Sequence, residues 1–452
     1  MKSYKYQFLI LFFALLINSC KEQDNPADQG NSTSYGTPYA NVPSTGDIVM
    51  YEVNQRAFST SGNFQGVINR LDSIKALGVN VIWLMPIHPI GILKTVNSPY
   101  CVRNYTGVNS EFGTLADLRK LADGAHSRNM AVIIDWVANH TAWDNPWIDS
   151  TNWYTKDAFG NIISPAGTNW ADVADLNYNN LNMRAAMIDA MKYWIFAANI
   201  DGFRCDAADM VPYDFWQQAI TTLNVLTGRK LIFLAEGSRA DHFTAGFQMN
   251  FGWDFYGNLK NIFRYNYNAS TVFTVNTNEN NSVPAGRRKL RFTSNHDESA
   301  WDATPITLFN GKSGALAASV ITAYLGGVPL IYGSQEVGTP NQVPFFTRQA
   351  VNWLQNPDMM IAYKKIFNFY GSSDALKKGT LETFPDNAVV CFRKTYQNKE
   401  VAVIVNTRNS TINFSVPALL RSAAWDDAFT GYPVIVSSFM TLAPYEYVVL
   451  QK

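Results

Sequence analysis

Arg204 and Asp206 stand two residues apart in the sequence Asp201-Gly-Phe-Arg-Cys-Asp206, directly after a short apolar approach. Side chains two apart on a strand point to the same side, so the guanidinium is expected beside the carboxylate. A neighbouring Arg favours the ionised form of a carboxyl group and lowers its pKa. An ionised carboxylate at the end of a strand can act as a nucleophile at a sugar carbon. The alternative is an ion pair that only ties a loop.

Four acidic residues stand where apolar segments of strand length end. They are Asp135, Asp206, Glu236 and Asp297. The carboxyl ends of the strands in a parallel barrel surround one mouth, so these side chains are expected to converge there. A single acidic residue at such a place is often a helix cap, whereas a cluster of ionisable groups in a cleft indicates a functional site. Three basic residues accompany the cluster: His140, Arg204 and His296.

Two or three carboxylates without a nucleotide-binding loop or metal-binding cysteines favour glycoside hydrolysis. One carboxylate attacks the anomeric carbon, and a second protonates the leaving oxygen and later activates water. Asp206, kept ionised by Arg204, suits the nucleophile. Glu236 follows an apolar run at residues 231–235, where burial raises its pKa, and it suits the acid/base. Carboxyl groups about 5–5.5 Å apart would predict retention of configuration.

The elements that must position these residues alternate between strand and helix from residue 47 onward. Eight apolar strands, most of them followed by a helix, predict a (β/α)8 TIM barrel over residues 47–374. A doubly wound open sheet is the alternative, but no glycine-rich dinucleotide turn follows the first strand. Strands are expected at 48–53, 79–85, 130–135, a stretch ending at 206, 231–236, 246–250, 290–295 and 329–332, and helices at 64–77, 115–128, 183–198, 215–226, 315–325 and 348–369.

Two regions depart from this alternation. Residues 141–176, after the third strand, are rich in Trp, Asn, Asp, Gly and Pro and predict a short inserted loop domain with a functional role. Residues 375–452 contain short alternating apolar runs and predict a C-terminal antiparallel β-sandwich domain. The insertion carries four tryptophans that could stack on sugars or form a small core, and we expect two of them to be core: Trp143, Trp147, Trp153 and Trp170.

The N-terminus has the pattern of a targeting segment. Residues 1–5 are basic, and residues 8–17 form an apolar run that is short for a membrane span. The following Asn18-Ser-Cys20 resembles a bacterial lipoprotein box, and Lys21-Glu-Gln-Asp24 is similar to the acidic surface-export signal of Bacteroidetes lipoproteins. We therefore expect a lipoprotein signal peptide at 1–20, a lipid anchor at Cys20 and a flexible tether at 21–46. An ordinary cleaved signal peptide is the alternative.

Composition narrows the class of partner. The 452 residues include 36 Lys and Arg and 36 Asp and Glu, so the formal net charge is zero. This balance argues against a nucleic-acid or polyanion partner. Aromatic residues make up 14% of the chain, which suits a protein that stacks rings on sugar faces as well as one with a large core.

Seven motifs resemble those of the α-amylase family, glycoside hydrolase family 13. Four of them resemble its signature regions, in order: Asp135-Trp-Val-Ala-Asn-His140, Gly202-Phe-Arg-Cys-Asp206, Phe233-Leu-Ala-Glu236 and Phe292-Thr-Ser-Asn-His-Asp297. Residues 78–86 resemble the motif of the second strand, residues 327–333 that of the eighth, and Asp175-Leu-Asn177 the end of the loop domain. The resemblance runs from about residue 47 to the C-terminus.

This resemblance implies roles for individual residues. It implies a retaining enzyme acting on α-glucans, with Asp206 as nucleophile, Glu236 as acid/base and Asp297 as transition-state stabiliser. It also implies that four residues line the sugar subsite at the reacting centre: Tyr100, which stacks under the sugar, His140, Arg204 and His296. Asp135 is expected to receive bonds from its neighbours within this subsite rather than to react.

The sequence departs from the family pattern after the nucleophile. Many members have Lys-His where this chain has Asp209-Met210, so the usual contacts to the next sugar are altered. That His often helps to hold calcium through its backbone, together with residues that match Asn139 and Asp175. The oxygen ligands at these two positions suit calcium, which is the one cofactor that the resemblance implies.

The interpretation is a lipid-anchored outer-membrane hydrolase, on the cell surface or alternatively facing the periplasm. It would cleave α-1,4 bonds in starch or maltooligosaccharides by double displacement, as part of a glucan-uptake complex. An α-glucan transferase of the same family is the nearest alternative, and the motifs do not separate the two. A non-catalytic glucan-binding lipoprotein and a structural surface protein are further alternatives, but neither needs three intact carboxylates.

Overall fold

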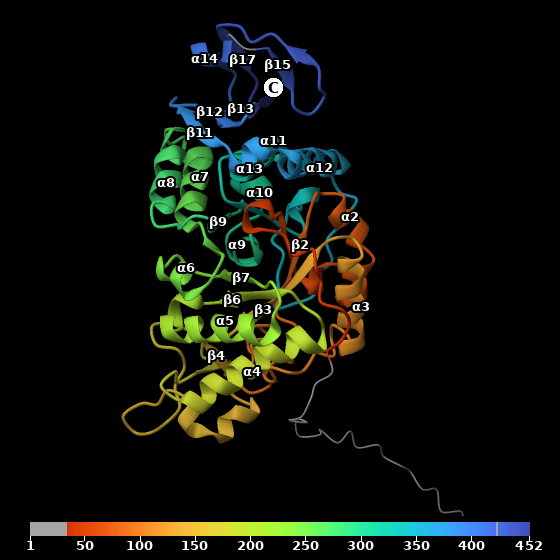
Figure 1. Cartoon of the computed structure of the whole chain (residues 1–452), viewed down its shortest axis with the longest axis vertical. Helices are drawn as coiled ribbons and strands as arrows, with labels where there is room; N and C mark the ends of the chain where they lie inside the picture. Colours follow the sequence, from red (N-terminus) through yellow and green to blue (C-terminus); the bar gives the residue numbers. More distant parts are fainter. Residues whose placement is uncertain (1–33, 422–423) are drawn as a thin grey trace, which may run out of the picture. The chain divides into compact units, whose positions relative to one another are not determined.

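Eight parallel strands close into a barrel in the computed structural model, which describes residues 34–421 and 424–452. Each strand pairs with two neighbours, in the order β1-β10-β9-β8-β7-β6-β3-β2, so the predicted TIM barrel is confirmed. Figure 1 shows β3, β6 and β7 of this barrel side by side. Nearly all strand residues are buried, as expected for strands covered on both faces. The strands are β1 (Met50–Val53), β2 (Val81–Leu84), β3 (Ala131–Val137), β6 (Gly202–Asp206), β7 (Ile232–Ala235), β8 (Met249–Phe251), β9 (Arg288–Arg291) and β10 (Val328–Tyr332).

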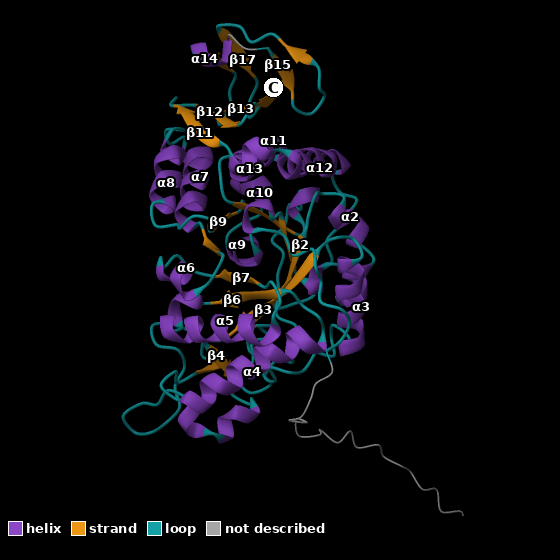
Figure 2. Cartoon of the chain, viewed as in Figure 1, coloured by secondary structure: helices purple, strands orange, loops and turns teal. Residues whose placement is uncertain are grey.

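Helices surround the barrel, as Figure 2 shows by the purple ribbons outside the orange strands. Those that follow barrel strands bury apolar faces against them, and together they form the main core. The helices are α1 (Phe64–Ile68), α2 (Leu71–Lys75), α3 (Leu115–His126), α4 (Leu181–Ala197), α5 (Tyr213–Thr227), α6 (Asp241–Ala245), α7 (Trp253–Tyr265), α8 (Thr271–Asn280), α9 (His296–Trp301), α10 (Pro305–Leu308), α11 (Lys312–Tyr324) and α12 (Pro357–Ser372).

Local chemistry explains where the elements on either side of the site begin. Helix α3 starts with a capping box, in which Thr114 and Asp117 bond to each other's backbone N–H groups. Helix α4 starts at Asn180, whose side chain accepts the N–H groups of two following residues. Strand β6 begins at Gly202, where a Cβ atom would lie 1.9 Å from the carbonyl oxygen of Ile232. Only glycine lets β6, which carries Arg204 and Asp206, pair this closely with β7.

The insertion after β3 forms a small layer of its own. Strands β4 (His140–Ala142) and β5 (Val173–Asp175) pair antiparallel, with two 3₁₀ turns at Pro146–Asp149 and Thr151–Trp153 between them. Trp147 packs against both Trp153 and Tyr105, and Trp143 also packs against the core, so three of the four tryptophans are core residues where two were expected.

The C-terminal region is an antiparallel β domain that has an apolar core of its own and also packs against the main core. A six-stranded sheet has the order β11-β12-β13-β18-β15-β16, and β14 pairs with β17 in a second sheet. Phe414 and Leu442 of the second sheet pack with Cys391 and Ile404 of the first. The elements are α13 (Asp374–Lys378), β11 (Thr380–Phe384), β12 (Val389–Tyr396), β13 (Lys399–Asn406), β14 (Ile412–Ser415), α14 (Ala418–Arg421), β15 (Trp425–Asp427), β16 (Pro433–Val434), β17 (Phe439–Leu442) and β18 (Tyr447–Gln451).

Some predicted boundaries were wrong. Strand β9 ends at Arg291, and the predicted strand residues 292–295 form a buried loop, because Asn295 caps α9 with its side chain. The predicted helix at 348–369 begins only at Pro357, a residue that suits the first turn of a helix. The predicted helix at 64–77 is split into α1 and α2.

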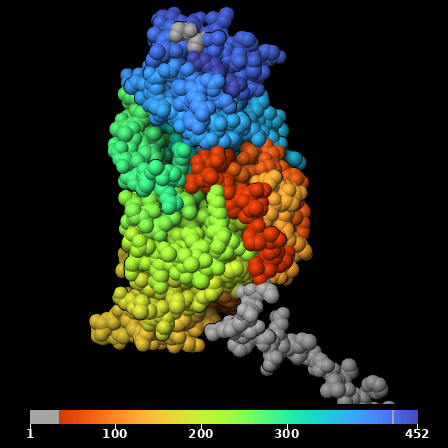
Figure 3. Space-filling model, in the orientation of Figure 1, coloured from red at the N-terminus to blue at the C-terminus, as the bar shows by residue number. Residues whose placement is uncertain are grey.

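The predicted flexible tether at 21–46 is wrong for its last part. Tyr39 stacks on His126 with ring centroids 4.4 Å apart, and the hydroxyl of Tyr35 donates to Asp123. Asn199 and Lys230 donate to backbone carbonyls of this segment, so residues 34–46 lie flat on the barrel, at the red end of the colour scale in Figure 3. The predicted signal peptide, Cys20 and the rest of the tether lie outside the described residues. Among those described, no helix is long and apolar enough to cross a membrane.

Candidate active site

The four acidic residues converge at the carboxyl ends of the barrel strands, although not all at strand ends. Asp206 is the last residue of β6, and Glu236 follows β7 directly. Asp135 lies inside β3, two residues before its end, and Asp297 lies in the first turn of α9. The structure therefore brings together the groups that the sequence predicted, in slightly different positions along their elements.

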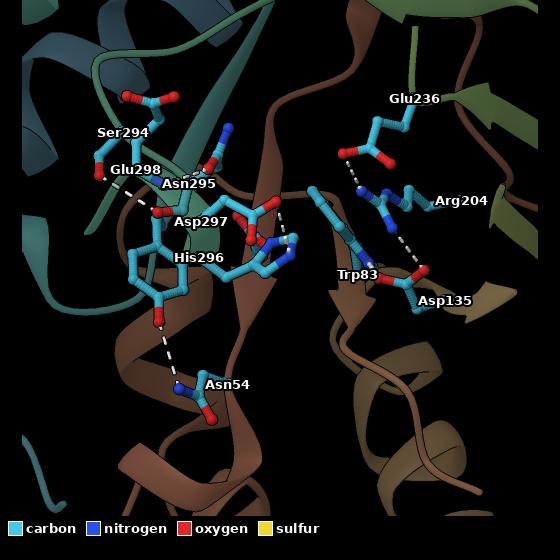
Figure 4. Close-up of polar contacts among 12 residues, drawn as sticks. Asn54, Trp83, Asp135, Arg204, Glu236, Ser294, Asn295, His296, Asp297 and Glu298 are labelled. Carbon is cyan, nitrogen blue, oxygen red and sulfur yellow. Dashed lines mark hydrogen bonds and ion pairs between the residues drawn. The ribbon is translucent and has the colours of Figure 1, made fainter. Parts of the chain in front are cut away.

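Arg204 joins three of these carboxylates. Its Nη1 atom donates to Asp135 Oδ1 at 2.8 Å and to Asp206 Oδ1 at 2.9 Å. Its Nη2 atom forms an ion pair with Glu236 Oε1 at 2.8 Å. Figure 4 shows the guanidinium between Glu236 and Asp135. A single buried cation thus holds the predicted nucleophile and the predicted acid/base beside each other.

Burial dominates the ionisation of these carboxyl groups. It raises the pKa of Asp206 to about 6, even though Arg204 lowers it. The expectation of a lowered pKa for Asp206 was wrong, because it counted the guanidinium and not the loss of water. Burial raises the pKa of Glu236 to about 7, as predicted, with the Asp206 and Asp297 carboxylates adding to the rise. Both carboxyl groups therefore keep a proton to higher pH than they would in water.

A second network surrounds Asp297. The Nε2 atom of His296 lies 3.4 Å from Asp297 Oδ2 and 2.7 Å from the hydroxyl oxygen of Tyr100. The rings of Tyr100 and His296 stack with centroids 5.3 Å apart. On its other side, Nδ1 of His296 lies 2.6 Å from Glu52 Oε1, at the end of β1. The tyrosine and the histidine are therefore held in one orientation beside the third carboxylate.

Asp135 lies beneath the site rather than on its surface. Its side chain is fully buried and accepts bonds from Arg204, from the indole N–H of Trp83 at 3.1 Å and from the hydroxyl of Tyr100 at 3.0 Å. With its acceptors occupied by these donors, Asp135 orients Arg204 and Tyr100, in line with the expectation that it receives bonds rather than reacts.

A cavity of about 510 Å³ opens above these groups. His140 lies in its wall, packed against Trp170 of the insertion, and burial lowers the pKa of His140 to about 4, so the ring is neutral. Trp170 is 37% exposed and faces the cavity, unlike Trp147 and Trp153. The lining residues that belong to the predicted site are Tyr100, His140, Asp206, Glu236, His296 and Asp297.

An aromatic wall that the sequence did not reveal closes another side. Trp301, which is 63% exposed, lines the cavity and packs edge-on against Phe345 and Phe346. Hydrogen bonds hold the backbone of this wall: Arg56 donates to the carbonyl of Phe345 at 2.7 Å, and Asn97 donates to that of Phe346 at 2.5 Å. The wall is therefore fixed before any ligand binds.

Comparison with known proteins agrees with this geometry. A family profile described as "Alpha amylase, catalytic domain" matches residues 29–159 and 168–253. A crystal structure of an alpha-amylase from Lactobacillus plantarum superposes with a TM-score of 0.80 and 27% identity, covering 90% of this chain and 99% of that one. The chain carries a catalytic domain of the alpha-amylase family.

Two curated relatives of this alpha-amylase-family chain differ in their stated activity. Alpha-amylase MalA of Haloarcula japonica is 25% identical over 396 residues, which cover 82% of this chain and 57% of that protein. Cyclomaltodextrin glucanotransferase of a Bacillus species is 26% identical over 425 residues, which cover 82% of this chain and 58% of that protein. The chain thus spans little more than half the length of these two relatives.

The residues that suggested calcium lie at one edge of the alpha-amylase-family site. Asn139 is buried between β3 and β4, its carbonyl oxygen accepts the N–H of Leu176, and Asp175 ends β5. Across residues 34–421 and 424–452, no group of three His, Cys, Asp or Glu side chains is placed to hold a metal ion. One carboxylate and one amide supply only part of the six to eight oxygens that calcium takes. Backbone carbonyls and water would have to complete such a site.

Sequence reasoning missed several residues of the alpha-amylase-family site. Glu52 and Trp83 stand in buried strands, among apolar residues that indicate only a core. Closure of the barrel brings Glu52 to His296 and Trp83 to Asp135. A buried Glu in the apolar run Met50–Val53 was the available signal. Phe345 comes from a loop and Trp301 from the end of the short helix α9, and neither stretch carries a periodic pattern.

Proposed function

We propose that this chain is a retaining glycoside hydrolase that cleaves α-1,4-glucosidic bonds in starch or maltooligosaccharides. The observation that carries the proposal is the contact of one guanidinium, that of Arg204, with both Asp206 and Glu236 at the floor of the cavity. The printed names of its relatives, which include alpha-amylases, support α-glucans as the substrate class.

In the first step, a carboxylate oxygen of Asp206 bonds to the anomeric carbon while the glycosidic bond breaks. Glu236 gives its proton to the leaving oxygen, and its raised pKa of about 7 keeps a proton available near neutral pH. Asp297 and the hydrogen-bonded pair Tyr100 and His296 face the same space and orient the sugar.

In the second step, Glu236 takes a proton from water, and the water oxygen replaces Asp206 on the anomeric carbon. The structure shows Glu236 accepting from both sides, with Oε1 beside Arg204 and Oε2 bonded to the N–H of Ala207 at 2.7 Å. These contacts suit the ionised form, which is the base of this step. The acid form must release one of them.

Product analysis of the purified protein with maltoheptaose tests the proposal. Chromatography over time should give shorter products only, with the α-anomer appearing first in the polarimetric or NMR signal. Longer products beside shorter ones would establish the transferase, which the relationship to a cyclomaltodextrin glucanotransferase makes the second candidate. Binding without any product would overturn both and favour a glucan-binding lipoprotein.

We also propose that the chain is lipid-anchored at Cys20 and exposed at the outer membrane, where it would work with a glucan-uptake complex. The lipoprotein-like sequence Asn18-Ser-Cys20 supports the anchor. Blocking lipoprotein signal processing should trap a precursor of higher mass in cells. An unchanged mature mass would contradict the anchor, and protease shaving of intact cells separates a cell-surface position from a periplasmic one.

Calcium at Asn139 and Asp175 is a further proposal, supported by their oxygen donors at the junction of the barrel and the insertion. A bound cation there would tie β5 to the end of β3. Chelation with EDTA should lower the melting temperature, and calcium but not magnesium should restore it. Unchanged melting after chelation would exclude the site.

A further inference from the structure

Two loops that carry the reacting groups are bonded to each other directly above β6 and β7. The loop after Asp206 includes a short 3₁₀ turn, Ala208–Met210. The N–H of Ala207 donates to the side chain of Glu236 at 2.7 Å, and the N–H of Ala208 donates to its carbonyl oxygen at 2.9 Å. The backbone N–H groups of the two residues that follow the nucleophile are therefore both hydrogen-bonded to the acid/base residue.

Asp209 adds hydrogen bonds to the residues after Glu236. Its carboxylate accepts the N–H of Ser238 at 3.1 Å and the N–H of Arg239 at 3.3 Å. The guanidinium of Arg239 reaches back and donates to the carbonyl oxygens of Asp209 at 2.9 Å and Val211 at 3.2 Å. The contacts run in both directions, and we call the contacts between residues 207–211 and 236–239 the clasp.

The fit at Gly237 shows how closely the clasp is packed. Gly237 has φ +146°, and a Cβ atom there would lie 2.4 Å from Asp209 Oδ1. Only glycine allows the carboxylate to approach this turn. Ala207 has φ 42° and ψ 41°, a conformation that a residue with a side chain adopts only when its surroundings hold it. Both loops thus depend on contacts with each other for their shape.

We propose that Asp209 is a positioning residue, which fixes the acid/base Glu236 relative to the nucleophile Asp206 by closing the clasp. The inference rests on the proposed function, because it assigns Glu236 its role. Asp209 does not touch the reacting groups itself. It acts through the N–H groups of Ser238 and Arg239, and a displaced acid/base loses the alignment that proton transfer needs.

The charged groups around the clasp determine how breaking its contacts would change the pKa of Glu236. Asp209 faces His242, whose Nε2 atom lies 3.3 Å away, and the guanidinium of Arg239. Glu236 faces Arg204, Asp206 and Asp297. Burial is the largest cause of the raised pKa of Glu236, so a loosened loop that admits water would lower this pKa. The alkaline limb of the activity profile would then move to lower pH, because the acid must be protonated to act.

The test compares Asp209→Ala, Asp209→Asn and the control Asp214→Ala on maltoheptaose. Asp209→Ala should reduce kcat by roughly 10- to 100-fold with little change in KM, and should shift the alkaline limb to lower pH. Asp209→Asn keeps an oxygen acceptor for only one of the two N–H groups and should restore kcat in part. Asp214 pairs with Arg184 on the neighbouring surface, so Asp214→Ala should match the wild type.

A readout without substrate separates this inference from the proposed function. Hydrogen exchange of the peptide covering residues 237–240 should be fastest in Asp209→Ala and intermediate between that variant and the wild type in Asp209→Asn, which keeps one of the two acceptors. If the wild type cleaves no glucan, the proposed function fails while this exchange pattern still tests the clasp. A lower melting temperature with unchanged kcat, pH profile and exchange would show a merely structural Asp209 and overturn the inference.

Discussion

His296 Nδ1 lies 2.6 Å from Glu52 Oε1, which joins α9 to β1, three strands away from β6 around the barrel. Burial alone would lower the pKa of His296, but the carboxylates of Asp297 and Glu52 outweigh it and raise the pKa to about 9. The imidazole is therefore positively charged at neutral pH, beside a carboxylate that lines the cavity.

Replacing Glu52 with Gln should lower both the pKa of His296 and the stability of the fold. A His with a folded pKa of about 9 contributes stability that is fully present below its unfolded pKa and is lost as pH rises through 9. The melting temperature of Glu52→Gln should therefore fall below that of the wild type most strongly near pH 6, and the gap should narrow toward about pH 10.

Glu382→Gln is the matched control, because Glu382 pairs in the C-terminal domain with Arg393, which stays charged over this pH range. Its melting temperature should follow that of the wild type at all pH values. A constant difference between Glu52→Gln and the wild type across the pH range would contradict the charged His296.

Replacing Asp206 with Asn should abolish turnover without unfolding the protein. An amide cannot form the covalent intermediate, so we expect kcat on maltoheptaose to fall by at least about 10³-fold. Asn keeps an oxygen for the Nη1 atom of Arg204, so the far-UV dichroism should stay unchanged. The same change at Asp189, which pairs with Lys192 on the surface, should leave activity intact. Retained activity in Asp206→Asn would overturn the mechanism.

The activity profile should be a narrow bell. The two carboxyl groups interact, so the limbs report apparent pKa values of the pair, near about 6 on the acid side and about 7 on the alkaline side. Glu236→Gln should lose activity on maltooligosaccharides and keep the first step on a nitrophenyl glycoside, whose leaving group needs no proton. Equal loss on both substrates would argue against Glu236 as the acid.

Replacing Trp301 with Ala should weaken the binding of long substrates. Its exposed ring lines the cavity and is held by Phe345 and Phe346, which leaves a preformed platform for a sugar face. We expect KM for maltoheptaose to rise about 3- to 10-fold with kcat nearly unchanged. Tyr265→Ala removes an equally exposed ring on α7, outside the cavity, and should have no effect. An unchanged KM in Trp301→Ala would remove it from the binding surface.

The parts of the fold and site that could be predicted share a local signal. Apolar runs of strand length gave the eight strands, and an acidic residue after such a run gave Asp206 and Glu236. Barrel closure then brings these residues together without any further information, since parallel strands share one carboxyl end. The chemistry of the site could be predicted because it depends on residues at this one end.

The parts that could not be predicted depend on distant contacts or on the balance of energies. Glu52 is 244 residues from His296, and nothing near either residue indicates the other. The pKa of Asp206 depends on how much water burial removes, which the presence of Arg204 alone does not tell. Residues 34–46 have the composition of a linker, and their order comes from the barrel surface beneath them.

The packed segment 34–46 lies at the end of the barrel away from the cavity. Its contacts are with Asn129, Asn199 and Lys230, which lie just before β3, β6 and β7, at the amino ends of the strands. The cavity lies at the carboxyl ends, where Asp206 and Glu236 stand. The segment therefore covers part of the amino end of the barrel and leaves the cavity at the other end uncovered.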